Sequence, residues 1–153
     1  MPETTATTRP KAPHVTRENL GFVLAKASQR WNELLWGGFS EHGFAEVRPS
    51  YGSVLVPLFE EDGLRMGEIA RRSRLSKQTM TTMVRLLERE RLVRREPDPH
   101  DRRAFRIVLT ARARRFEPVA ESTLAELGAL AMDRLGERRL ASVKHGLKEW
   151  IET

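Results

Sequence analysis

The sequence contains no cysteine among its 153 residues. This absence excludes disulfide bonds, thiolate catalysis, thiol-based redox sensing and cysteine-ligated zinc. Histidine, another common metal ligand, is scattered and never forms a short-spaced pair. We therefore expect neither a metal site nor a cofactor. The four histidines are His14, His42, His100 and His145.

Long apolar runs are missing as well. No stretch approaches the roughly 20 apolar residues that cross a membrane as a helix, and the N-terminus lacks the hydrophobic region of a signal peptide. The opening stretch MPETTATTRPKAPH is rich in Thr and Pro and poor in apolar residues, so residues 1–15 are predicted to be a disordered tail. The sequence predicts a cytoplasmic protein with no membrane association.

Acidic residues are scarce in one contiguous third of the chain. Residues 65–115 hold 16 basic and 6 acidic residues, a net charge of +10, whereas the remaining residues hold 11 and 15, a net charge of −4. A solvated charged face would mix the two signs more evenly. The segregation favours a polyanionic partner for the central third.

Apolar residues recur at helical spacing at both ends of the chain. A helix is predicted from Thr16 until "WGGF" (36–39) ends it, and Pro49 suits the first turn of a second helix in which Pro57 predicts a kink or an early end. After Thr110 the pattern is helical again, with a break at Gly136. The terminal helices carry more apolar surface than a monomer of this size is expected to bury. These apolar faces therefore either pair with a second copy of the chain or fold back on the core.

The middle of the chain is more varied. Two short helical patterns, "GEIARRSR" and "SKQTMTTMVRLLERER", are separated only by "LS", with Ser76 as a natural N-cap. Two alternating segments, "LVRREPD" and "RAFRIVLT", then flank a loop that contains Pro and Asp. The predicted fold class is mainly α with a small β-hairpin wing. We expect one compact domain, with the helix-turn-helix and its hairpin at 48–110 and dimerisation helices at 16–47 and 111–153.

The second short helix, residues 76–91, has the composition of a helix that reads a major groove. Met80, Val84 and Leu87 share the inner face, and no glutamate occurs in the first three turns. Its outer side chains are donors and acceptors of the types that bond base edges and phosphates, whereas an ordinary amphipathic helix would include acidic residues there. The predicted DNA-binding residues on it are Ser76, Lys77, Gln78, Thr81, Thr82 and Arg85.

The hairpin loop, residues 97–104, is the second candidate contact. Arg102 and Arg103 suit a narrow, negative minor groove, and His100 is a further candidate DNA contact. Asp101 would repel phosphate, so its expected role is to pair with one of these arginines and hold the loop's shape. A solvated turn with incidental charge is the alternative.

At this point the chain resembles the MarR family of winged helix-turn-helix regulators. The most specific match is the wing, D-P-x-D-R-R leading to a strand that ends in Leu-Thr, at Asp98–Thr110; weaker matches fall at 67–70, 75–76 and 86–88. Two positions depart from the family pattern. Arg91 stands where a glycine commonly follows the second helix, and Arg65 replaces a Ser/Thr cap.

The resemblance implies a homodimer on a pseudo-palindromic double-stranded operator. It also implies a transcription regulator, usually a repressor, released by a small and often aromatic or phenolic ligand. Arg102 and Arg103 would be the wing arginines, and Asp101 the acid that orients one of them. The candidate ligand-binding residues are Trp31, Trp36, His42 and Tyr51, although an aromatic residue on an amphipathic helix is more often part of the core.

Other functions remain as alternatives. A constitutive or architectural winged-helix DNA-binding protein would need no effector. An enzyme is not expected, because the sequence has no Gly-rich phosphate loop, nucleophile elbow or clustered acid–base pair and therefore no candidate catalytic residue. An RNA-binding or protein-interaction module is a third class, but the outer face of the second short helix lacks the aromatics on which RNA bases stack.

Overall fold

The computed structural model describes residues 15–153. The predicted disordered tail lies outside the described residues except for Val15. The described chain is mainly helical with a small antiparallel sheet, as the sequence predicts. Its elements are α1 (Leu20–Glu41), the short 3-10 helix η1 (Pro49–Tyr51), α2 (Gly52–Glu60), β1 (Leu64–Arg65), α3 (Met66–Arg72), α4 (Lys77–Arg89), β2 (Val93–Asp98), β3 (Asp101–Leu109), α5 (Ala111–Leu135) and α6 (Glu137–Ile151).

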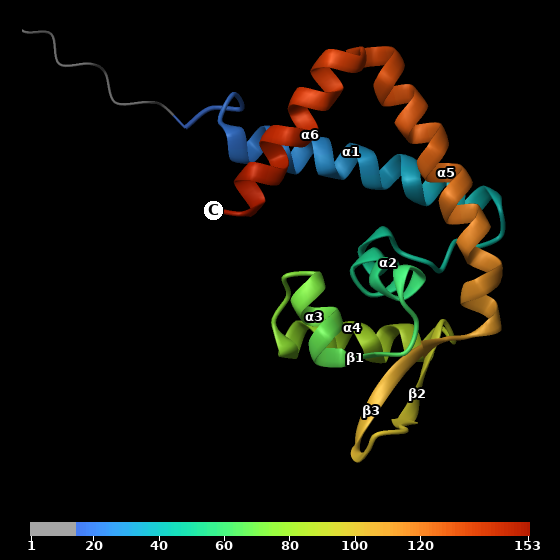
Figure 1. Ribbon diagram of the computed structural model, residues 1–153. Coiled ribbons are helices and arrows are strands. Elements are labelled where there is room, and N and C mark those ends of the chain that lie inside the picture. The colour runs from blue at the N-terminus through green and yellow to red at the C-terminus, as the bar shows by residue number, and fades with distance from the viewer. Residues whose placement is uncertain (1–14) are drawn as a thin grey trace, which may run out of the picture.

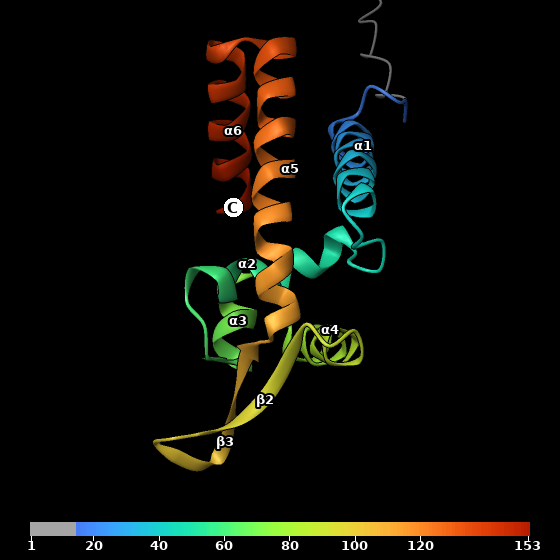
Figure 2. The same cartoon turned by 90° about the vertical axis from the view of Figure 1, so that its right-hand side faces the viewer.

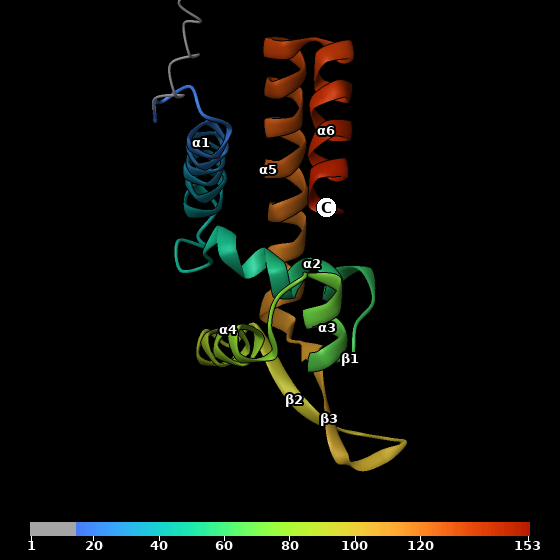
Figure 3. The same cartoon turned by 90° about the vertical axis from the view of Figure 1, so that its left-hand side faces the viewer.

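The elements form an upper and a lower part (Figure 1). The upper part consists of α1, α6 and most of α5, and the lower part holds α3, α4 and the β2–β3 hairpin, with α2 between the two. Side views show α5 and α6 as upright antiparallel neighbours (Figures 2 and 3). The N-terminal end of α5 lies at the base of the hairpin. The long helix α5 therefore connects the two parts.

The sheet has three strands rather than the two that the sequence predicts. Its order is β1-β3-β2, and both pairs are antiparallel. The additional strand is β1, whose Leu64 pairs with Ile107 and whose Arg65 pairs with Arg106. A two-residue strand is too short to be recognised from a sequence pattern. Its pairing is seen only in the folded structure, where β3 lies beside it.

The predicted end of the first helix at "WGGF" is wrong. Helix α1 continues through both glycines to Glu41. At Gly38 a Cβ would overlap the Thr123 side chain on α5, coming within 2.9 Å of its Oγ1, whereas at Gly37 nothing lies within 4 Å. The close approach of α1 and α5 continues at Phe39 and Phe116, whose ring centroids lie 4.7 Å apart. Gly38 is therefore a packing residue, not a helix break.

The turn after α4 is left-handed although its residue is arginine. Arg91 has φ +58°, in the region that glycine adopts most cheaply. Its carbonyl accepts a hydrogen bond from Thr110 Oγ1 at 2.6 Å, and its amide donates to the Glu88 carbonyl at 3.0 Å. Arg91 thus adopts the left-handed conformation for which glycine is better suited.

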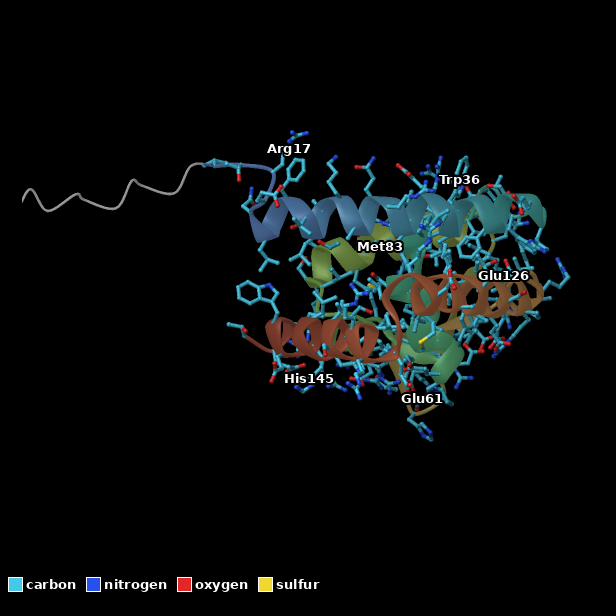
Figure 4. All side chains as sticks on the ribbon, turned by 90° about the horizontal axis from the view of Figure 1, so that it is seen from above. Arg17, Trp36, Glu61, Met83, Glu126 and His145 are labelled. Atoms are coloured by element: carbon cyan, nitrogen blue, oxygen red, sulfur yellow. The ribbon has the colours of Figure 1, made fainter. Side chains whose placement is uncertain are left out.

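Helix α6 buries none of its residues. Apolar side chains are exposed along α1 and α5 as well. In the view from above, His145 lies on the side of α6 that faces away from α1 (Figure 4). No helix within residues 15–153 is long and apolar enough to span a membrane. The exposed apolar residues of these helices include Leu20, Val23, Leu130, Met132, Val143, Leu147, Trp150 and Ile151.

Candidate nucleic-acid interface

Helix α4 is built with one buried and one open face. Ser76 caps it by accepting a hydrogen bond from the Thr79 amide at 3.1 Å, as expected for this residue type. Met80, Val84 and Leu87 are fully buried. The predicted outer residues are exposed, with one exception described next. The exposed residues are Ser76, Lys77, Gln78, Thr82 and Arg85.

Thr81 lies at the edge of this open face. It is half-buried, and its hydroxyl donates to the Lys77 carbonyl at 2.8 Å and lies 3.4 Å from the sulfur of Met66. Its hydrogen-bonding capacity is therefore partly used inside the protein. Thr82 also bonds its own helix, at 3.2 Å from the Gln78 carbonyl, but its side chain stays exposed.

The acidic side chain near the C-terminal end of α4 is neutralised from the hairpin. Glu88 accepts a hydrogen bond from Arg95 Nε on β2 at 2.9 Å. No acidic residue lies in the first turn of the helix. The N-terminal half of the open face therefore presents only cationic and neutral polar groups to a ligand.

The turn of the wing is held by Asp98. One carboxylate oxygen accepts the His100 amide at 2.8 Å, and the other accepts Arg65 Nε at 2.8 Å. These bonds, first the amide and then the guanidinium, lower the pKa of Asp98 below its ordinary value, because both favour the ionised form. The sequence pattern places Asp98 in the wing loop but does not reveal its partner Arg65, which stands out in the sequence only because it replaces a Ser/Thr cap.

Asp101 does not pair with the guanidinium of Arg102 or Arg103 as the sequence predicts. Its Oδ1 accepts the backbone amide of Arg103 at 3.0 Å, and its Oδ2 lies 4.0 Å from Arg65 Nη2. Asp101 thus shapes the backbone of the wing tip. The physical reason is that Arg65, on β1 beside the hairpin, already supplies the positive charge that faces both aspartates.

The wing arginines are open to solvent. Arg102, Arg103 and His100 are exposed, and within residues 15–153 neither guanidinium has a carboxylate partner. A charge without an internal partner on a braced loop is available to an external anion. The hairpin closes with Asp98 opposite Asp101, after an irregularity at 97–98.

A cavity of about 230 Å³ lies between α1, α2 and α5. Most of its wall is apolar, and Arg48 is the one charged residue that lines it. Trp31 is the only one of the four predicted ligand-binding residues on its wall. The other lining residues are Asn32, Leu35, Phe39, Val47, Pro49, Gly52, Leu55, Val56, Phe59, Phe116, Ala120 and Leu124.

The other three predicted ligand-binding residues do not line this cavity. Trp36 Nε1 donates to the Ala45 carbonyl at 2.7 Å, and the Arg48 guanidinium lies 5.7 Å from its ring centroid. His42 Nδ1 lies 2.8 Å from the Gly38 carbonyl at the end of α1. Tyr51 belongs to the buried core. Sequence reasoning missed Arg48, which carries no local motif.

Residues 15–153 contain no cluster of three His, Cys, Asp or Glu side chains that could hold a metal ion.

Residues 54–104 match a family model described as the MarR family. This matched segment contains α3, α4, β2 and the wing tip, the elements that form the candidate interface. The comparison with curated proteins found no match.

The fold is similar to several solved structures. The PcaV transcriptional regulator from Streptomyces coelicolor, solved with its natural ligand, has 20% identity over 92% of this chain and 98% of its own, with a TM-score of 0.76. A DNA complex of MepR from S. aureus has 20% identity, coverage of 88% and 97%, and a TM-score of 0.75. A MarR-family protein from Mycobacterium tuberculosis with salicylic acid has 25% identity, coverage of 86% and 96%, and a TM-score of 0.59.

Proposed function

We propose that this chain is a MarR-family winged helix-turn-helix protein that regulates transcription by binding double-stranded DNA, with α4 in a major groove and the wing in the neighbouring minor groove. The observation that carries the proposal is the pairing of an acid-free, exposed N-terminal half of α4 with unpaired arginines on a braced hairpin. The solved MepR–DNA complex, which has the same fold, supports it.

A mobility-shift assay on the DNA upstream of the chain's own gene tests this function. We expect a discrete complex on a fragment with two related half-sites spaced by about 10 bp or a multiple of it, because a two-fold dimer places its recognition helices one DNA turn apart. Equal binding to every fragment would favour an architectural protein, and no binding to any genomic fragment would contradict the proposal.

Base reading is assigned to the first turns of α4. Gln78 can bond an adenine edge through two hydrogen bonds, while Lys77, Ser76 and Arg85 suit phosphates or guanine. We expect Gln78→Ala to relax the preference at one base pair by roughly 1–3 kcal/mol, measured by competition between operator variants. A uniform loss across all variants would instead assign Gln78 to the backbone.

The apolar surface of α1, α5 and α6 fits a homodimer interface, so residues 16–47 and 111–153 are proposed as the dimerisation helices. An amphipathic helix without a buried residue, such as α6, needs a partner to cover its apolar stripe. Light scattering should give twice the 17.6 kDa mass of one chain. A monomer mass at micromolar concentration would contradict this assignment.

We further propose that the chain is a repressor released by a small aromatic ligand in the cavity between α1, α2 and α5. The solved complexes of PcaV with its natural ligand and of the M. tuberculosis protein with salicylic acid support small-molecule binding by this fold. In this chain Arg48 and Trp31 both line the cavity, and the Arg48 guanidinium could pair with an acidic group of the ligand. A thermal-shift screen of aromatic acids, followed by mobility-shift assays with the stabilising compounds, tests this ligand role. A screen without any stabilising compound would favour a constitutive DNA-binding protein.

We expect no enzymatic activity.

A further inference from the structure

Three arginines gather at the C-terminal end of α4, away from the base-reading end. Arg89 ends the helix, Arg91 follows in the left-handed turn, and Arg115 comes from the first turns of α5. They border an open hollow of about 490 Å³, which Arg112 and Glu90 also line. We call Arg89, Arg91 and Arg115 the distal arginine cluster.

The charges of this cluster are not used inside the protein. All three side chains are exposed, and none has a carboxylate partner within residues 15–153. Their neighbour Arg112 is different, because it pairs with Glu46 and donates from Nε to the Glu90 carbonyl at 3.0 Å. Arg112 thus braces the hollow, and the cluster keeps three free guanidinium groups around it.

The backbone beneath the cluster is fixed. The left-handed turn at Arg91 is held between the Glu88 carbonyl and the Thr110 hydroxyl. Thr110 also caps α5, whose first turn contains no acidic residue, so the partial positive charge of that helix end is uncompensated. Guanidinium groups on a rigid base lose little conformational freedom when they bind an anion.

The cluster continues the DNA-facing side of α4. Gln78, Arg85 and Arg89 are separated by seven and four residues, spacings that keep side chains on one face of a helix. A helix of 13 residues is about 20 Å long, whereas the major groove is about 12 Å wide. A helix that lies across the groove with its N-terminal turns on the bases therefore brings its other end to a bordering phosphate strand.

The arrangement of the lower part agrees with this position. The end of α4 lies beside the start of α5 and the start of β2, and the hairpin then descends from it (Figures 1 and 2). We propose that the distal arginine cluster is a second phosphate-binding surface, which holds the DNA backbone at the edge of the major groove that α4 occupies. The inference rests on the proposed function.

The test is the salt dependence of operator binding by the full chain. In Arg89→Gln/Arg115→Gln, the slope of log K against log[salt] should fall by about 0.9 for each phosphate that the variant no longer neutralises, with base preference unchanged. The control is Arg134→Gln/Arg138→Gln, which removes the same charge at the α5–α6 turn, at the opposite end of the molecule (Figure 1); its slope should equal that of the wild type.

Ethylation interference locates the contact. Phosphates whose ethylation blocks the wild type but not the Arg89→Gln/Arg115→Gln variant should lie along one edge of the major groove. An unchanged slope and an unchanged interference pattern, with the wild type binding its operator, would overturn the inference alone and leave the cluster for a different acidic partner. A wild type that binds no DNA would overturn the proposed function and this inference together.

Discussion

Arg65 fixes the wing tip from outside the wing. It lies at the N-cap position of α3 but makes no capping bond there. Its guanidinium turns to Asp98 and Asp101 instead, because the pairing of β1 with β3 brings it beside the hairpin. The wing arginines themselves stay exposed, so Arg65 holds the loop that presents the proposed DNA-contacting residues.

Replacing Arg65 should loosen the wing tip. In Arg65→Met the pKa of Asp98 should rise toward its ordinary value, since one of the bonds that favour the ionised carboxylate is removed. Operator affinity should fall several-fold while the preference among bases stays the same. An NMR titration of Asp98 and a binding curve measure the two effects.

Arg71→Met is the matched control, because Arg71 pairs with Glu68 on α3 and not with the wing. An unmoved Asp98 titration in Arg65→Met would mean that the amide of His100 alone holds the turn. Equal affinity losses in both variants would assign Arg65 to bulk charge instead of positioning.

At this scale the sequence predicted residue types better than partners. The turn role of Asp98 and the cap at Ser76 depend on neighbours two or three residues away, so local patterns suffice. The partner of Asp98 is 33 residues away. Only the sheet brings them together, and for the same reason Asp101 was assigned the wrong arginine.

Among the elements, α1 contains two adjacent glycines whose structural environments differ. The sequence pattern predicts a helix end at Gly37 and Gly38, since glycine is a poor helix former. In the structure one faces open space and the other meets Thr123 on α5. Local propensity cannot distinguish them, because the second helix that Gly38 touches lies about 85 residues further along the chain.

Alanine substitutions at the two glycines should change the free energy of unfolding in opposite directions. Gly37→Ala should stabilise the fold by about 0.5–1 kcal/mol, the usual helix gain over glycine. Gly38→Ala should destabilise it by about 1–3 kcal/mol, because the methyl group forces α1 and α5 apart. Urea unfolding of both variants measures the free energies, and a stabilising Gly38→Ala would contradict the close packing of the two helices.

Helix α3 carries an ion-pair network that predicts acid sensitivity. Arg71 and Arg72 lower the pKa of Glu68 from 4.5 to about 2, chiefly through their hydrogen bonds. Arg72 also bonds Glu61 at the end of α2, at 2.5 Å. A carboxylate with a depressed folded-state pKa contributes stability that is present above pH 4.5 and is lost as the pH falls toward 2.

Glu68→Gln should therefore flatten the dependence of stability on pH over that window. Its melting temperature should be lower than that of the wild type at pH 7, and the difference should shrink as the pH falls from 4.5 toward 2. Melting curves by circular dichroism at a series of pH values measure this. A constant difference down to pH 2 would mean that Glu68 acts through packing and not through its charge.

For the whole molecule, the order of elements and the winged helix-turn-helix were predictable because each depends on periodicity and turn chemistry. The third strand, the α1–α5 contact and Arg48 were not, because they depend on where distant segments meet. The charge segregation seen in the sequence has a structural counterpart, since the basic third of the chain forms the lower part and α5's first turns (Figure 1).

The most direct test of the central claim is a salt titration of operator binding by the full chain and by Arg102→Ala/Arg103→Ala. The account predicts that the double variant binds more weakly and that its slope of log K against log[salt] falls by about one unit for each phosphate that it no longer neutralises. An affinity and a slope identical to those of the wild type would contradict the wing's role in DNA binding.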